Sequence, residues 1–124
     1  MGKHRIQGIS DEFIPAIVDL AQLDAVLAVS AGDSILMARK LTAQPGLGVG
    51  ISSGCNLLAA VAAQEALGGD AVVVTVFASD NKKYLIADLL RSEPVKPDYG
   101  YSHLEFTGIR VLPRSCRTCG ELAG

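Results

Sequence analysis

Tryptophan is absent from this 124-residue chain, and aromatic residues make up only 5% of it. Hydrophobic residues nevertheless account for 49% of the sequence. The core must therefore be built from Val, Ile, Leu and Ala, a composition typical of a parallel sheet covered by helices. The length suits one domain with one core of modest size.

A strong charge of either sign is also lacking, because 11 Lys and Arg residues stand against 13 Asp and Glu residues, a formal net charge of −2. This balance gives no reason to expect nucleic acid or an anionic membrane as a partner. Each apolar run is interrupted by Asp, Gln, Glu or Gly within about 18 residues, too short to cross a bilayer. The basic N-terminal "MGKHRIQGIS" lacks the apolar stretch of a signal peptide. We expect a soluble, cytoplasmic protein.

Cysteine is scarce, and the odd number of three does not indicate a disulfide framework. Cys116 and Cys119 have the CxxC spacing of a redox pair or of half a zinc site. A structural zinc site requires four ligands, and His103 is the only further candidate in that region. We therefore predict no metal site, with a thiol- or metal-responsive tail as an alternative. Cys55 is interpreted as a small packing residue.

Apolar patterns predict helices and strands in alternation. Continuous apolar runs predict buried strands at residues 25–30, 47–52 and 71–77, and residues 103–112 are a candidate for one more. Short connections between strand, helix and strand predict right-handed crossovers. The sequence therefore predicts an α/β fold with three αβα layers and a parallel sheet.

Four helices are expected around these strands. The first begins near Phe13 or Ile14, and the second is capped by Asp33 or Ser34 and ends at Pro45. The third is the alanine-rich segment 53–67, closed by Gly68 and Gly69, and the last covers residues 82–91. The buried positions predicted for the first two helices are Ile14, Ile17, Val18, Leu20, Ile35, Met37, Ala38 and Leu41.

The turn "GVGISSG", residues 48–54, joins a predicted strand to the third helix. Open α/β sheets bind ligands at such turns, and the free N–H groups of a first helical turn favour an anion. The pattern is not a Walker A motif, because no lysine follows the glycine, and it lacks the spacing of a dinucleotide fingerprint. From the residues alone, both an anion site and a simple tight turn remain open.

Four segments occur in an order and spacing that carry a family resemblance: "HRIQGISDEFIP", "DAVLAVSAGDSILMARKL", "GLGVGISSG" and "DNKKYLIADLL". Together they resemble the C-terminal part of the cysteine synthase (O-acetylserine sulfhydrylase) family. These are pyridoxal-phosphate enzymes of the tryptophan-synthase-β-like fold (fold type II), related to cystathionine β-synthase. The resemblance implies that residues 1–91 are the C-terminal portion of a catalytic domain and residues 92–124 an extension.

The resemblance implies that Ser52 hydrogen-bonds the pyridine nitrogen of pyridoxal 5'-phosphate, and that Gly8 lines the cofactor and substrate pocket. A neutral hydroxyl leaves this nitrogen unprotonated and the cofactor a weaker electron sink. That setting suits replacement of the acetate of O-acetylserine by sulfide, or the related cystathionine β-synthase chemistry. Ser53 is interpreted as a helix N-cap and Tyr84 as a packing residue.

The family's Schiff-base lysine, its Asn-containing substrate loop and its phosphate loop are not found in this chain, so no catalytic residue is assigned. The lysines present are interpreted as solvated: Lys3, Lys40, Lys82, Lys83 and Lys96. We expect the last third of a family member, inactive alone, whose exposed apolar surface favours a homo-oligomer. The alternative is a stand-alone, non-catalytic α/β interaction domain.

Overall fold

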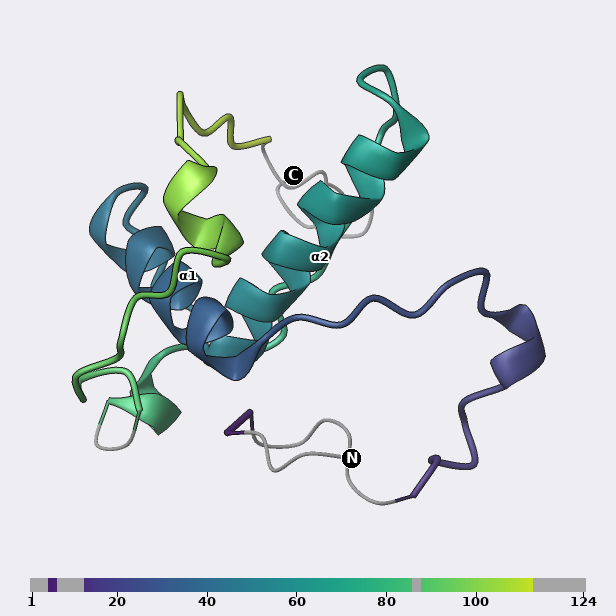
Figure 1. The fold of residues 1–124 in the computed structure, drawn as a ribbon, viewed down its shortest axis with the longest axis horizontal. Coiled ribbons are helices and arrows are strands. Elements are labelled where there is room, and N and C mark those ends of the chain that lie inside the picture. Colours follow the sequence, from purple (N-terminus) through teal and green to yellow (C-terminus); the bar gives the residue numbers. More distant parts are fainter. Residues whose placement is uncertain (1–4, 7–12, 86–87, 113–124) are drawn as a thin grey trace, which may run out of the picture.

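A computed structural model describes residues 5–6, 13–85 and 88–112 of the chain. Two α-helices form its centre, α1 (Ala31–Ala43) and α2 (Ile51–Leu67), and they lie against each other in Figure 1. The other regular elements are three 3₁₀ turns: η1 (Leu20–Gln22), η2 (Lys82–Tyr84) and η3 (Gly100–His103). No helix in this part of the chain is long and apolar enough to cross a membrane.

Helix α1 begins at Ser30, whose Oγ accepts a hydrogen bond from the backbone N of Asp33 at 3.2 Å. The predicted cap at Asp33 or Ser34 is therefore wrong, and both of these residues are buried inside the helix. The predicted end before Pro45 is confirmed. The inward-facing residues are also those that the periodicity predicted, each at most 1% exposed: Ile35, Met37, Ala38 and Leu41.

Helix α2 has its N-cap at Gly50 and its C-cap at Gly68, whose positive φ of +102° is a backbone conformation that favours glycine. It crosses α1 at Gly54. A Cβ at Gly54 would lie 2.2 Å from the carbonyl oxygen of Ser34 and 2.8 Å from the backbone N of Ala38. Glycine at this position therefore allows the two helix backbones to come into direct contact.

Two clusters of buried side chains form the core. The aromatic ring of Tyr84 is 3% exposed in the first cluster, which confirms its interpretation as a packing residue. Cys55 is half-buried and packs against the same cluster. The members of the first cluster are Ile6, Ile35, Ala38, Ile51, Tyr84 and Leu89, and those of the second are Met37, Leu41, Val49 and Leu58.

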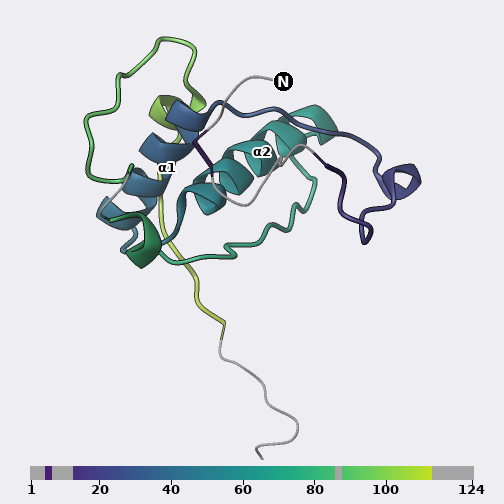
Figure 2. The same cartoon turned by 90° about the horizontal axis from the view of Figure 1, so that it is seen from below.

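The parallel sheet of the predicted αβα fold is not formed by the described residues. Residues 25–30, 71–77 and 104–112 have no regular β-structure. Of the predicted strand 47–52, residues 51–52 belong to α2, and Val49 makes only an antiparallel bridge with Asp80. An extended segment becomes a strand only when a second backbone satisfies its N–H and C=O groups. Figure 2 shows the chain beyond α2 running back along the helix as an isolated segment.

The predicted first helix is also wrong. Within residues 13–22 the only regular element is η1, and the expected buried stripe is exposed: Ile14 is 61% exposed, Ile17 93%, Val18 39% and Leu20 56%. Helices of this length depend on a core against which the apolar stripe can pack, and none of the described residues covers this stripe. The predicted helix 82–91 is reduced to η2, with residues 86–87 outside the described ranges.

The segment that contains η3 packs on α1. The carboxylate of Asp33 accepts hydrogen bonds from the backbone N of Gly100 at 2.7 Å and of Tyr101 at 2.9 Å. At the other end of η3, the Lys40 ammonium donates to the carbonyl oxygens of Tyr101, at 2.9 Å, and of Leu104. A carboxylate thus meets free N–H groups and an ammonium meets free carbonyls, the pairing that the ends of a helical turn favour.

Candidate functional site

The predicted cofactor contact, Ser52, lies in the first turn of α2 and is half-buried. Its Oγ is 3.3 Å from the Oγ of Ser79, and either hydroxyl can be the donor in this hydrogen bond. Ser79 was not predicted from the sequence. The signal that would have found it is its position just beyond the apolar run 71–77, after Ala78, where polar residues of α/β proteins gather around ligands.

Backbone hydrogen bonds hold these two serines together. The N–H of Gly50 donates to the carbonyl oxygen of Ser79 at 2.7 Å, and the N–H of Asn81 donates to that of Gly48 at 3.0 Å. A Cβ at Gly50 would lie 2.2 Å from Ser79 Oγ and 2.7 Å from Cε2 of Tyr84. The absence of a side chain at Gly50 therefore makes room for the serine pair at the start of α2.

Ser53 is not the helix N-cap that the sequence suggested. The N-cap is Gly50, which has no side chain, so no side-chain hydrogen bond caps α2. The Ser53 side chain is fully buried instead, and its Oγ has no hydrogen-bond partner among the described residues. The two neighbouring hydroxyls therefore differ. That of Ser52 is half-buried and hydrogen-bonded to Ser79, whereas that of Ser53 is buried and has no hydrogen-bond partner among the described residues.

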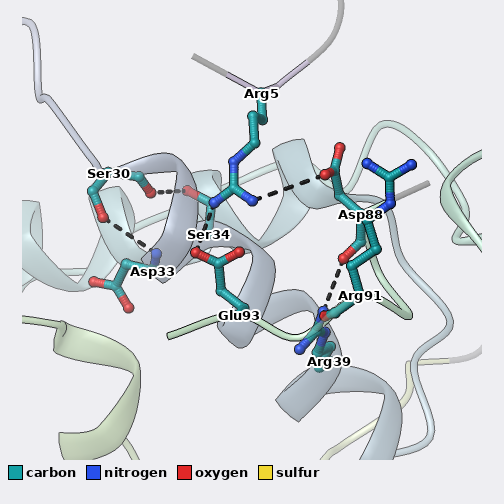
Figure 3. A network of polar contacts seen from close by, with 8 residues as sticks. All are labelled: Arg5, Ser30, Asp33, Ser34, Arg39, Asp88, Arg91 and Glu93. Atoms are coloured by element: carbon teal, nitrogen blue, oxygen red, sulfur yellow. Dashed lines mark hydrogen bonds and ion pairs between the residues drawn. The ribbon is translucent and has the colours of Figure 1, made fainter. Parts of the chain in front are cut away.

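The second predicted site residue, Gly8, lies outside the described residues, but the two described residues that precede it are firmly anchored. Ile6 is 4% exposed in the core. The guanidinium of Arg5 donates to Oε1 of Glu93 at 2.6 Å and lies 3.9 Å from Oδ1 of Asp88 (Figure 3). The hydrogen bond from Arg5 lowers the pKa of Glu93, whose side chain is 5% exposed, and the same bond raises the pKa of Arg5.

A second arginine fixes the neighbouring turn. Nη2 of Arg39 donates to the carbonyl oxygen of Asp88 at 2.8 Å and to that of Arg91 (Figure 3). Arg39 belongs to α1, so residues 88–91 are tied to the same helix that carries the η3 contacts. Together, Arg39 and Arg5 connect three segments that are far apart in the sequence: residues 5–6, α1 and residues 88–93.

The interpretation of all lysines as solvated is wrong for Lys40, which is half-buried and hydrogen-bonded to η3. Lys82, Lys83 and Lys96 are exposed, as predicted, and Lys3 lies outside the described residues.

Within the described ranges, no group of three His, Cys, Asp or Glu side chains is arranged to hold a metal ion. Cys116 and Cys119 lie outside those ranges. A pocket of about 580 Å³ lies between α1, α2 and η3, but neither Ser52 nor Ser79 lines it. It is therefore separate from the serine pair.

The ends of two apolar segments thus meet at a glycine-rich turn that leads into a helix, a ligand-site geometry of the α/β class. No family model matches the chain. Among curated proteins, the cysteine synthase of Buchnera aphidicola is 39% identical over 89 residues, 71% of this chain and 28% of the relative. Cysteine synthase B of Campylobacter jejuni is 42% identical over 88 residues, 71% of this chain and 29% of the relative.

Solved structures give a closer sequence match. The hydrogen sulfide-producing enzyme of Fusobacterium nucleatum is 54% identical, with a TM-score of 0.78 over 89% of this chain and 34% of that one. A lysine-dimethylated mutant of a hydrogen sulfide-producing enzyme, complexed with an alpha-aminoacrylate intermediate, is 59% identical, with a TM-score of 0.74 over 79% of this chain and 29% of that one.

The predicted resemblance is confirmed: the chain is homologous to part of the cysteine synthase family, consistent with a C-terminal part. It spans less than a third of the length of the curated relatives that it matches.

Proposed function

We propose that these residues form part of a pyridoxal-phosphate enzyme that makes or breaks the bond between sulfur and the β-carbon of an amino acid. The relatives named cysteine synthase and hydrogen sulfide-producing enzyme support this class of reaction. The observation that carries the proposal is the half-buried hydroxyl of Ser52, which stands at the position that the resemblance assigns to the cofactor's ring nitrogen.

The serine pair fits such a cofactor. A pyridine nitrogen that is not protonated accepts one hydrogen bond, and Ser52 supplies one when the Ser79 hydroxyl donates to Ser52 Oγ, 3.3 Å away. When bound, pyridoxal phosphate supplies the electron sink for β-elimination. The hydroxyl of Ser52 donates a hydrogen bond without transferring its proton, so it orients the ring and leaves the nitrogen neutral.

Two glycines near the serine pair help to hold Ser52 in place because they lack a side chain. Gly50 leaves room for Ser79 Oγ, and Gly54 fixes the first turn of α2 against α1. These contacts hold Ser52 in one orientation before a ligand arrives, which reduces the ordering that binding would otherwise require.

The identities support one direction of the reaction over the other. The sulfide-producing enzyme is 54% and 59% identical to this chain in its two solved structures, whereas the two cysteine synthases are 39% and 42% identical. We therefore favour release of sulfide from a sulfur-containing amino acid. Synthesis of cysteine from O-acetylserine and sulfide is the second candidate.

The 124 residues by themselves are proposed to be inactive. A Schiff-base lysine must be desolvated or otherwise tuned so that its amine is neutral. Lys82, Lys83 and Lys96 are exposed, and Lys40 is held by the carbonyl oxygens of Tyr101 and Leu104. None of these four is placed to carry the cofactor.

Two preparations test the proposal. The purified chain with added pyridoxal phosphate should show no visible absorbance band that borohydride abolishes. The chain joined to the remaining two thirds of the Fusobacterium nucleatum enzyme should bind the cofactor and release sulfide from cysteine. A joined protein that folds and binds the cofactor, yet turns over neither cysteine nor O-acetylserine, would indicate the alternative of a non-catalytic interaction domain.

A further inference from the structure

The carboxylate of Glu93 is buried at the start of α1. Its side chain is 5% exposed, although the residue lies in the segment that the sequence marked as an extension. A Cβ at Gly32, the second residue of α1, would lie 2.6 Å from Oε1 of Glu93 and 2.2 Å from the hydroxyl oxygen of Tyr99. The absence of a side chain at Gly32 therefore makes room for both groups. The helix dipole favours a carboxylate at this end of a helix, but burial away from water also requires a partner of opposite charge.

The partner is Arg5, 88 residues away in the sequence. Nη2 of Arg5 donates to Oε1 of Glu93 at 2.6 Å, and Nη1 lies 3.9 Å from Oδ1 of Asp88 (Figure 3). Arg39 of α1 holds the same segment through the carbonyl oxygens of Asp88 and Arg91. The contact between Arg5 and Glu93, the clasp, thus ties the first described residues of the chain to α1.

Residues 5–6 are held through their side chains. Among the described residues, no backbone–backbone hydrogen bond involves either of them. Ile6 is nevertheless 4% exposed and belongs to the first core cluster. The two residues are adjacent, so an Arg5 side chain that is free to move leaves Ile6 in place by its own packing alone.

The cluster that contains Ile6 also supports the turn that carries Ser52. Ile51, the first residue of α2, directly precedes Ser52 and is fully buried in this cluster. Tyr84 belongs to it as well, and a Cβ at Gly50 would lie 2.7 Å from its Cε2. Packed interiors transmit displacement, because a side chain that moves leaves a gap which its neighbours must fill. The position of Ile6 is therefore coupled to the first turn of α2.

We propose that Glu93 is a positioning residue for the cofactor site. Through Arg5 it keeps Ile6 in the core cluster, and the cluster holds the turn that carries Ser52 in its binding geometry. That pyridoxal phosphate is the ligand of this turn rests on the proposed function. Loss of the clasp lowers the fraction of molecules in which the turn is formed, and it leaves the hydrogen bond from Ser52 unchanged in those that remain. The affinity for the cofactor therefore falls, while the position of its visible band stays the same.

Hydrogen exchange of the 124-residue chain tests the clasp without any cofactor. Three backbone amides report on the turn because their hydrogen bonds hold it, those of Gly50, Ser53 and Asn81. In Glu93→Gln these amides should exchange about fivefold faster relative to the amides of residues 58–64 in α2. The comparison within one molecule corrects for a loss of global stability, which affects both groups.

Three further variants separate the clasp from other effects of the substitution. Arg5→Gln should match Glu93→Gln, and the double variant should exchange no faster than either, because the same interaction is lost in all three. Glu105→Gln removes a carboxylate at an exposed position and should leave the ratio unchanged. Additive effects in the double variant, or an unchanged ratio in Glu93→Gln, would overturn the proposal.

The chain joined to the remaining two thirds of the Fusobacterium nucleatum enzyme tests the link to the cofactor. Titration of the cofactor-free protein with pyridoxal phosphate should give a dissociation constant about fivefold higher in Glu93→Gln, with the visible band at the same wavelength. Glu105→Gln should bind as tightly as the original. A joined protein that binds no cofactor at all would contradict the proposed function, while the exchange ratio of the isolated chain would still decide whether Glu93 holds the turn. Unchanged affinity or a shifted band in Glu93→Gln would overturn the positioning role.

Discussion

Gly54 is the residue at which the two helices depend most on the absence of a side chain. In Gly54→Ala the new Cβ would meet backbone atoms of Ser34 and Ala38, which cannot rotate away as a side chain can. The higher helix propensity of alanine offsets only about 1 kcal/mol. We therefore expect a net loss of about 2 kcal/mol in the free energy of unfolding, measured by urea titration of the helical circular dichroism signal.

Gly69→Ala is the matched control for this substitution. A Cβ at Gly69 would have no atom within 4 Å, and its φ is not in the left-handed range. The free energy of unfolding should change by less than about 0.5 kcal/mol. Equal effects of the two substitutions would contradict the close crossing at Gly54.

Glu93 is a residue whose ion pair makes stability depend on pH. The hydrogen bond from Arg5 lowers the pKa of Glu93 in the folded chain. Its contribution is therefore fully present above the unfolded pKa of about 4.3 and is lost as the pH falls through the lower folded value. At pH 7, Glu93→Gln should lower the free energy of unfolding by about 1 kcal/mol, since the Arg5 side chain is 47% exposed and water screens the pair.

Urea titrations of Glu93→Gln and of the original chain at pH 7 and pH 3 measure this effect. The difference between the two should shrink at the lower pH, while Glu105→Gln, at an exposed position, should behave like the original chain at both. A difference that stays constant from pH 7 to pH 3 would show that Glu93 stabilises the fold by packing alone.

The secondary-structure elements fall into two groups. Local sequence specifies the first group, and the second forms only when another segment of polypeptide packs or pairs with it. Pro45 and Gly68 mark the ends of α1 and α2, and the apolar spacing of α1 matches its buried face, so both helices were predictable. The strand predicted at residues 71–77 is not formed, because its side-chain pattern is local but its hydrogen bonds require a second backbone, which none of the described residues supplies. The helix expected near Ile14 is absent for a related reason, since the described residues provide no core to cover its apolar stripe.

The element η3 shows a contact that the sequence did not predict. Asp33 was expected to cap its own helix, but its carboxylate binds the backbone of Gly100 and Tyr101, 67 and 68 residues away. Asp33→Asn removes the charge and one of the two acceptors, so it should cost about 1–2 kcal/mol of stability. The amides of Gly100 and Tyr101 should also exchange with deuterium faster than in the original chain.

Asp98→Asn, at an exposed position next to Tyr99, provides the comparison. It should leave the exchange of both amides unchanged. If Asp33→Asn also leaves the exchange unchanged, η3 is held by packing and by Lys40 without a contribution from the carboxylate.

At the scale of the whole molecule, the described residues form a pair of helices together with extended segments, residues 25–30, 71–77 and 104–112, that form no strand. Ser52 could be predicted by resemblance because its motif is contiguous. Its partner Ser79 could not, because the two meet only through the backbone bonds of Gly50 and Asn81.

The cofactor spectrum of the joined protein, made of this chain and the remaining two thirds of the Fusobacterium nucleatum enzyme, tests the central claim most directly. Ser52→Ala should shift the visible band of bound pyridoxal phosphate and slow sulfide release at least tenfold, because the ring nitrogen loses its hydrogen-bond donor. Ser53→Ala, which removes a buried hydroxyl without a partner in the described chain, should leave the band in place. An unchanged spectrum in Ser52→Ala would contradict the assignment of this turn to the cofactor.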